Sequence, residues 1–178
     1  MTWLQADADA EARYRALDAL AVSAASIPAL LTALRDDSWR GRRRAADRLG
    51  GLEATPETVQ QLVSMLAQRD DTGARNAAAA VLSQLGVAVL PAIVQLLQHA
   101  DPDQRKFAAD ILGALRRPEA VVPLVAAIQD ADPNVRTSAA EALGHVGGAE
   151  ARRALEKLLG SRDVLLRVCA LEGLADPV

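Results

Sequence analysis

One phrase of sequence occurs six times in this chain, and the spacing of its arginines constrains the fold more than any other feature. Neighbouring copies of the aligned arginine are 29, 33, 30, 31 and 31 residues apart in a chain of 178 residues. A unit of this length holds about two helices and cannot bury its own hydrophobic face, so units of this kind stack on one another. The six arginines are Arg13, Arg42, Arg75, Arg105, Arg136 and Arg167.

The residues around each arginine follow the rules of a closely packed helix. Counted from the arginine, position +3 is always Ala, position +7 is always Leu, and position +8 is Ala, Gly or Ser. At about 100° per residue, positions +3, +4, +7 and +10 form one continuous apolar arc. Position −4 is Asp in five copies and Ser in one. Its side chain is expected to accept hydrogen bonds from the first turn of the helix.

A second helix is expected before each of the last five copies, and three of these helices carry proline at the same place. Pro28, Pro91 and Pro123 lie 14, 14 and 13 residues before their arginine. Proline should start or kink the helix there, because it lacks an N–H and its ring obstructs the preceding turn. Gln61 and Ala154 take its place in the other two units, where a weaker kink is expected.

This pattern resembles HEAT-like repeats, in particular the short class found in bacterial and archaeal scaffolds and in phycobilin-lyase subunits. The resemblance runs from about Asp9 to Leu174. It implies an all-α, right-handed α-α superhelix that forms a single domain over residues 1–178. We expect an unpaired N-terminal capping helix at about 9–21, followed by five helix pairs. The pairs are predicted at about 26–52, 55–86, 87–116, 117–147 and 148–175.

Composition narrows the class of protein further. Hydrophobic residues make up 51% of the chain and aromatic residues only 2%, which predicts a core of Ala, Leu and Val. A net charge of −3 does not favour nucleic acid or an anionic membrane as the main partner. Cys169 is the one cysteine, so no intrachain disulfide forms and a reducing compartment fits. No secretory signal or stretch of about 20 apolar residues is present, and a cytoplasmic location is expected.

The binding surface is predicted on the side of the second helices opposite the apolar arc. Positions +1, +2, +5 and +9 lie there, and their residues vary between copies while the packing positions do not. In a HEAT-like solenoid this side usually forms the concave face, where repeat proteins bind. Tyr14 and Phe107 are rare aromatic residues and are predicted to act as apolar anchors. The alternative for Phe107 is that an adjoining repeat or loop covers it. The predicted partner-binding residues are Tyr14, Arg15, Arg43, Arg44, Asp47, Asn76, Gln84, Lys106, Phe107, Asp110, Thr137, Ser138, Glu141 and His145.

Charged residues on this face have two interpretations each. Position +5 is acidic in five of the six copies, which predicts a stripe for a basic peptide or protein segment. The alternative is local pairing within helices, as for Arg43 with Asp47 and Lys106 with Asp110. The repeated arginines are expected to pair with the helix-start Asp of the same or the next unit. The five arginines between positions 40 and 48 are either a site for phosphate or an acidic partner, or a solvated face.

Catalytic signals are weak. His99 and His145 are 46 residues apart and fall on different helices. The His-Glu pairs that iron-binding, HEAT-like deoxyhypusine hydroxylases need do not occur, nor do CxxC, HExxH or a phosphate loop. Cys169 at position +2 is expected to be accessible, but nothing nearby in its helix would activate it. The sequence therefore predicts a protein that is not an enzyme and that holds no metal or cofactor.

The first hypothesis is a non-enzymatic scaffold that binds a partner protein or peptide on the concave face of the second helices. The alternative is a phycobilin-lyase-like subunit or chaperone that acts on a protein-bound chromophore, and only the resemblance implies it. Nucleic-acid binding, as in HEAT-like alkylpurine DNA glycosylases, is disfavoured by the acids on this face. The last helix carries Val164, Leu165, Val168 and Leu171, which predict self-association or docking at that end.

Overall fold

The computed structural model describes residues 3–21 and 23–175, with side chains from Asp9 onward. Within these ranges the chain forms eleven α-helices and three short 3-10 helices, and it contains no strand. No helix in the described ranges is both long enough and apolar enough to cross a membrane. The chain divides into two compact units, Met1–Leu85 and Gly86–Val178, here called unit 1 and unit 2.

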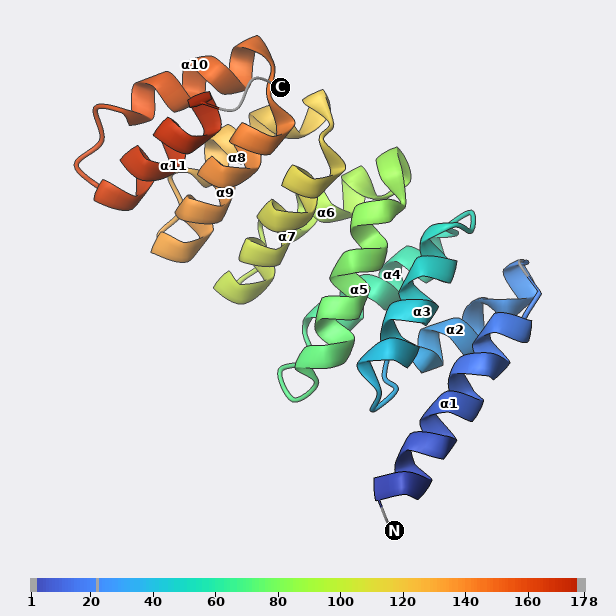
Figure 1. Ribbon diagram of the computed structural model, residues 1–178. Helices are drawn as coiled ribbons and strands as arrows, with labels where there is room; N and C mark the ends of the chain where they lie inside the picture. Colours follow the sequence, from blue (N-terminus) through green and yellow to red (C-terminus); the bar gives the residue numbers. More distant parts are fainter. Residues whose placement is uncertain (1–2, 22, 176–178) are drawn as a thin grey trace. The chain divides into compact units, whose positions relative to one another are not determined.

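Unit 1 consists of an unpaired helix followed by two helix pairs (Figure 1). Helix α3 packs against α1, α2 and α5, and α4 packs against α5. We call the first helix of each pair the outer helix and the second the inner helix. The helices are α1 (Trp3–Ala19), α2 (Ile27–Ala33), α3 (Trp39–Gly50), α4 (Pro56–Leu66) and α5 (Thr72–Gln84).

Unit 2 consists of three helix pairs. Its inner helices α7, α9 and α11 lie side by side, with α9 in contact with both of the others. The outer helices α6, α8 and α10 pack behind them. The structure therefore confirms the predicted all-α solenoid of five helix pairs plus one unpaired N-terminal helix. The helices are α6 (Leu90–Leu96), α7 (Pro102–Leu115), α8 (Val121–Ala127), α9 (Pro133–Val146), α10 (Gly148–Leu158) and α11 (Val164–Ala175).

The starts of the inner helices follow the prediction in four copies and depart from it in two. Helix α1 begins at Trp3 rather than near residue 9, so Asp9 lies inside the helix and cannot cap it. Ser38 precedes α3, but its side chain makes no capping hydrogen bond. In the other copies the carboxylate at position −4 accepts from a backbone N–H two or three residues further on. These caps are Asp71, Asp101, Asp132 and Asp163.

The prolines of the outer helices act as predicted. A short 3-10 helix precedes α2, α6 and α8, and each of these three α-helices is only 7 residues long. Helices α4 and α10 lack the proline at this place and run without interruption for 11 residues. Proline removes one helical hydrogen bond and crowds the turn before it. This explains why these outer helices consist of a 3-10 turn followed by a short α-helix.

Three inner helices are followed at position +11 by a residue with positive φ. The residue at position +11 has φ of 67° at Gly86, 69° at Gly147 and 50° at Arg116. The two glycines adopt positive φ without a steric penalty, because glycine has no Cβ. Gly147, with ψ of −162°, lies in a region open essentially to glycine alone. Arg116, with ψ of 41°, is left-handed although it carries a Cβ, which costs about 1 kcal/mol or more.

The small residue at position +8 sets how closely the inner helices of unit 2 approach. A Cβ added at Gly113 would lie 2.8 Å from Cα of Ala142, and one added at Gly144 would lie 2.8 Å from Cα of Gly173. Helices α7, α9 and α11 therefore pack backbone to backbone. In unit 1, a Cβ added at Gly50 would instead meet the side chain of Gln84, both its amide group and its Cβ, the latter at 2.9 Å.

The repeated arginines hold the turn between the two helices of their own pair. Arg136 Nη1 donates to the carbonyl oxygens of Asp130 and Ala131, at 3.1 Å each. Arg42 and Arg105 donate in the same way to the carbonyls five and six residues before them. A guanidinium with its planar set of donors can satisfy two carbonyls of a turn at once. This contact within the pair was not predicted from the sequence.

The same arginines also link neighbouring pairs, though through a different carboxylate from the one predicted. Arg105 makes a two-pronged ion pair with Asp130, at 2.7 and 2.8 Å, and Arg13 binds Asp36 in the same way. Both acids stand at position −6 of the next repeat, in the turn, rather than at the helix start. The hydrogen bond from Arg105 lowers the pKa of the Asp130 carboxyl.

The last pair departs from this pattern because position −6 is a serine. The Ser161 hydroxyl oxygen accepts the N–H of Asp163, as a turn carboxylate does elsewhere, but it carries no charge for an arginine. Arg136 therefore reaches the helix-start carboxylate of Asp163, at 3.4 Å. Arg136 is therefore paired with a helix-start aspartate of the next repeat, as the sequence predicts.

Candidate functional site

The candidate site is the exposed side of the inner helices, and the structure narrows the positions that form it. Positions +1, +5 and +9 are exposed or half-buried in both units. Position +2 was expected to be exposed as well, but Ser138 and Cys169 at this position are buried. The glycine contacts bring α7, α9 and α11 so close that each helix covers the +2 residue of the next. Ser138 is therefore removed from the candidate surface.

On unit 1, charged groups at these positions are mostly engaged with each other. Arg43 pairs with Asp47 at 3.2 Å along α3. Arg44 reaches across to Asp18 on α1. Arg15 pairs with Glu11 at 3.1 Å. For these residues the structure supports the interpretation as local ion pairs.

The aromatic and amide residues of unit 1 are also in contact with neighbours. The Arg40 guanidinium lies 5.3 Å from the centre of the Tyr14 ring, a cation–π arrangement. Tyr14 is half-buried rather than fully exposed. Asn76 and Gln84 are exposed on α5, and Gln84 leans on Gly50 of α3.

The basic patch between positions 40 and 48 is largely used within unit 1. Arg48 donates to the carbonyl oxygens of Asp18 and Leu20, at the end of α1. Arg42 binds the turn before α3, as described above. The contacts favour a structural role for the patch over an anion site, because helix-end carbonyls are natural partners for arginine.

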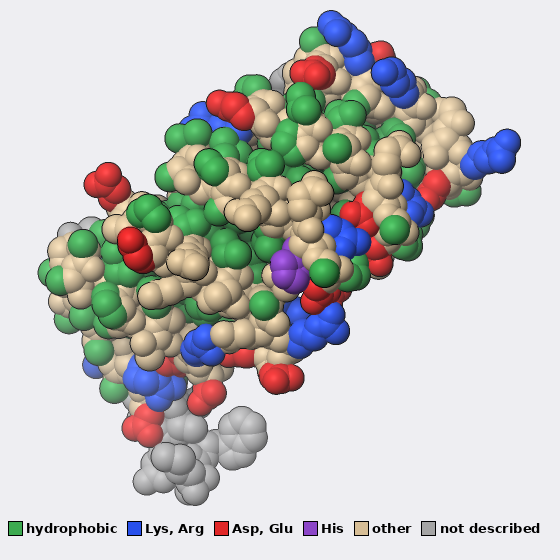
Figure 2. Space-filling model, turned by 180° about the vertical axis from the view of Figure 1, so that it is seen from behind, with side chains coloured by type: hydrophobic (Ala, Val, Ile, Leu, Met, Phe, Trp, Pro, Cys, Tyr) green, Lys and Arg blue, Asp and Glu red, His purple; other side chains and the backbone are tan. Residues whose placement is uncertain are grey.

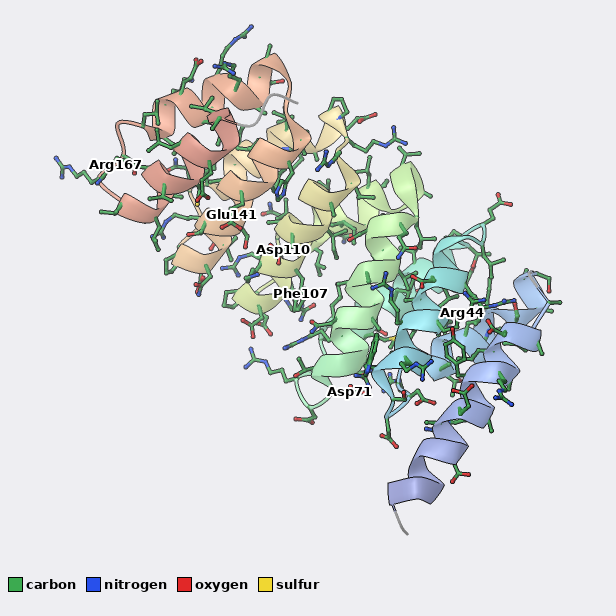
Figure 3. All side chains as sticks on the ribbon, viewed as in Figure 1. Arg44, Asp71, Phe107, Asp110, Glu141 and Arg167 are labelled. Carbon is green, nitrogen blue, oxygen red and sulfur yellow. The ribbon has the colours of Figure 1, made fainter. Side chains whose placement is uncertain are left out.

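On unit 2, the equivalent surface carries two acids that form no ion pair within the described residues. Asp110 is paired with Lys106 at 2.7 Å, but Glu141 and Glu172 have no ion pair within the described part of the chain. The three carboxylates occupy position +5 of consecutive inner helices and are all exposed. Figure 3 shows Asp110 and Glu141 on the adjacent helices α7 and α9. We call Asp110, Glu141 and Glu172 the acidic row.

The remaining predicted residues of unit 2 flank this row. Phe107 is half-buried on α7, and His145 is exposed in the last turn of α9. The Thr137 hydroxyl donates to the carbonyl oxygen of Pro133 at 2.9 Å, so its proton is already engaged. Lys106 is held by Asp110. Glu141 and Glu172 are therefore the least engaged charges on the exposed side of the inner helices of unit 2.

Cys169 is not an accessible nucleophile. Its side chain is buried beneath the acidic row, with Sγ 3.9 Å from Oε1 of Glu141. Burial, reinforced by the negative charge of Glu141, raises the pKa of the thiol above its usual value. The thiol stays protonated near neutral pH and is a poor nucleophile. The expectation that it would be accessible was wrong.

The histidines and the outer side of the molecule add no catalytic cluster. His99 Nδ1 accepts the backbone N–H of Asp101 at 3.0 Å, in the turn before α7. Among the described residues, no three His, Cys, Asp or Glu side chains gather as a metal site would require. Hydrophobic side chains are frequent on the side shown in Figure 2, and Val122 of α8 is among the most exposed in the described chain.

Sequence reasoning missed three carboxylates that shape these surfaces. Asp36 and Asp130 form ion pairs with repeated arginines of the preceding repeat. Glu11 pairs with Arg15 and lies 3.8 Å from Arg40. For Asp36 and Asp130 a signal existed, because both stand six residues before a repeated arginine. Glu11 had only the four-residue spacing to Arg15 to mark it.

The comparisons with known proteins agree with this architecture. A profile of HEAT repeats matches residues 1–83 and 90–175. The chain belongs to the HEAT-repeat family. No curated protein sequence matches it.

Several solved HEAT-type structures share the fold at low identity. The complex of CpcE and CpcF of phycocyanin lyase from Nostoc sp. PCC7120 is 22% identical, with 85% of this chain and 99% of that chain covered and a TM-score of 0.59. A structure of microtubule plus-end tracking by XMAP215, CLIP-170 and EB1 is 21% identical, with coverages of 98% and 85% and a TM-score of 0.62. Human deoxyhypusine hydroxylase in complex with glycerol is 21% identical, with coverages of 86% and 74% and a TM-score of 0.56. This HEAT-type fold is thus shared by an enzyme, a lyase complex and a microtubule-tracking assembly, and the likeness concerns the fold alone.

Proposed function

We propose that this protein is a non-enzymatic scaffold that binds a basic segment of a partner protein on the exposed inner-helix side of unit 2. The observation that carries the proposal is the acidic row, in which Glu141 and Glu172 lack an internal cation. Solenoid proteins bind partners through surface residues that vary between repeats while the packing residues stay fixed. The residues on this side vary in that manner.

Spacing and charge define the segment that would fit. Adjacent inner helices of a packed solenoid lie about 8–10 Å apart, so consecutive carboxylates of the row repeat at about that distance. In an extended chain, side chains on one face recur about every 6.5–7 Å, so basic residues two or three apart can meet successive carboxylates. Phe107 and His145 flank the row and would contact apolar or polar groups of the same segment.

The test is a charge reversal in the middle of the row. Glu141→Lys should weaken binding of a labelled Lys/Arg-rich peptide about tenfold, because it replaces an attractive charge by a repulsive one. This is a loss of about 1.4 kcal/mol in binding free energy, and fluorescence anisotropy at low salt measures it. Capture of partners from a cell lysate by the wild type and by this variant should differ in the same direction. Glu141 is exposed, so thermal stability should stay unchanged.

A matched control separates the row from bulk charge. Glu119→Lys introduces the same change at an exposed acid in the 3-10 turn before α8, away from the inner helices. It should leave peptide binding within about twofold of the wild type, because a solitary rim charge contributes little. Equal loss of binding in both variants would show that only net charge matters, and equal binding by Glu141→Lys and wild type would remove this surface from consideration.

A further inference from the structure

The final inner helix exposes long apolar side chains on the side where every earlier inner helix of its unit meets its successor. Val164, Val168 and Leu171 of α11 are 59%, 43% and 59% exposed. Val164 and Leu171 stand at positions −3 and +4, on the same side of the helix as the +8 glycines that contact the next helix. In the preceding repeats of unit 2, position +4 is a buried Ala, at Ala109 and Ala140. Terminal repeats of a solenoid normally present a polar outer face.

Two charged groups at the same end, Arg167 and Glu172, make no ion pair within the described residues. Arg105 and Arg136 each take a carboxylate from the following repeat, whereas Arg167 donates only to the carbonyl oxygen of Ser161 among the described residues. Glu172 at position +5 also has no cation within the described ranges. The end of unit 2 therefore leaves an apolar surface and Arg167 without the contacts that a following repeat supplies, and it leaves Glu172, like Glu141, without a cation in the described chain.

The opposite end of the chain leaves the complementary surface open. Positions −1 and +6 of α9, at Val135 and Ala142, are buried on the side that faces the preceding helix. The same positions of α1, at Ala12 and Ala19, are exposed, as is Arg15 at position +2. This side of α1 is lined by small residues and one cation, with no preceding helix in the described chain.

The two open ends match in size and in charge. Inside unit 2, a helix surface of small residues receives its neighbour closely, as at Gly144 and Gly173. Small residues on α1 can likewise receive the longer Val168 and Leu171. In unit 1, Asp18 at position +5 pairs with Arg44 at position +2 of the next inner helix. Glu172 and Arg15 occupy those two positions at the two ends, where Arg15 is otherwise paired, among the described residues, only with Glu11 of its own helix.

We propose that this protein associates head to tail, with α11 of one copy packed against α1 of a second copy and Glu172 paired with Arg15. The contact joins two different surfaces, so each added copy leaves one α1 end and one α11 end open. The number of copies in an assembly should therefore rise with protein concentration, unless the two ends of one assembly meet and close a ring. Glu172 belongs both to this contact and to the acidic row, but Glu141 is not part of the contact, so Glu141→Lys tests the binding role and the variants below test the association separately.

The decisive experiment blocks one end at a time. Leu171→Lys blocks the α11 end and Ala12→Glu blocks the α1 end, both at exposed positions, and circular dichroism verifies folding. In sedimentation velocity, the wild type should show a weight-average mass that rises with concentration. Each blocked variant should remain monomeric alone, whereas an equimolar mixture should form a dimer and nothing larger, since only one compatible pair of ends remains.

Charge exchange and a matched control complete the test. Glu172→Arg and Arg15→Glu should each weaken association about tenfold, and the double variant should recover it because the pair is restored in reverse. Leu159→Lys, at an exposed leucine next to α10, should associate like the wild type. A wild type that stays monomeric at every concentration, or an Ala12→Glu variant that dimerises alone through α11, would overturn the proposal.

Discussion

Units 1 and 2 are built from the same repeated phrase, yet they use it differently. In unit 2 the inner helices meet at glycines, backbone against backbone, while in unit 1 the corresponding contact passes through the side chain of Gln84. The exposed acids at position +5 also differ, being paired with arginine in unit 1 and partly unpaired in unit 2. The comparison teaches that the repeated positions fix the helices, while the residues between them decide packing tightness and available charge.

The largest effect is expected where the two units differ in helix contact. Gly144→Ala should lower the free energy of unfolding by about 2 kcal/mol, because overpacking against Gly173 outweighs the gain in helix propensity. Gly50→Ala should lower it by less, about 1 kcal/mol, since the Gln84 amide can rotate away while its Cβ, at 2.9 Å, cannot. Chemical denaturation measures both. Equal losses in the two variants would show that unit 1 is packed as tightly as unit 2.

The next largest effect is expected at the ion pair between repeats, which is formed by Arg13 and Asp36 in unit 1 and by Arg105 and Asp130 in unit 2. Asp130→Asn should lower the free energy of unfolding by about 1.5 kcal/mol, because the Arg105 side chain it binds is only 15% exposed. Asp36→Asn should cost about 0.5 kcal/mol, since Arg13 is 47% exposed and water screens the pair. Thermal denaturation near neutral pH ranks the two variants, and a larger loss for Asp36→Asn would reverse the comparison.

Acid should act on the same two carboxylates. Hydrogen bonds from arginine lower the pKa of both Asp36 and Asp130 in the folded protein. A lowered folded pKa gives stability that is present above the unfolded value, about 3.9, and is lost as pH falls through the folded value. Unfolding free energy should therefore decline below about pH 4. The Asp130→Asn variant should show a shallower decline, and an unchanged slope would contradict this assignment.

The smallest expected effect concerns the end of α7. Arg116→Gly should raise the free energy of unfolding by about 1 kcal/mol, because glycine adopts this left-handed backbone without the steric cost that the Cβ of Arg116 carries. The melting temperature in differential scanning calorimetry should rise accordingly. Gly147→Ala should lower it by at least as much, since φ of 69° with ψ of −162° is open essentially to glycine alone. A melting temperature that falls in Arg116→Gly would contradict this prediction.

Much of the fold could be predicted because it depends on local chemistry. The Ala and Leu positions, the caps such as Asp71, and the outer helices divided at Pro28 and Pro91 all follow from neighbouring residues along the chain. The start of α1 could not be placed in this way. No outer helix or turn precedes α1 in the described chain, so neither supplies a signal for its beginning.

The candidate site was less accessible to prediction, because its exposure depends on contacts between helices. Ser138 and Cys169 are covered since glycines on the adjoining helix permit a close approach. Whether an acid at position +5 is paired depends on a side chain of another repeat, as for Asp18 with Arg44. The i,i+4 pairs of Arg43 and Lys106 were predictable, since both partners belong to one helix.

The arginine that closes each helix pair has a consequence for how such a chain can lengthen. Arg42, Arg105 and Arg136 bind carbonyl oxygens five and six residues before themselves, within their own pair. A duplicated segment of one full period, about 31 residues, would carry both donor and acceptors with it. A tandem copy of another length would separate them wherever its junction fell between the arginine and those carbonyls, so growth by whole repeats leaves every turn closed whatever the position of the junction.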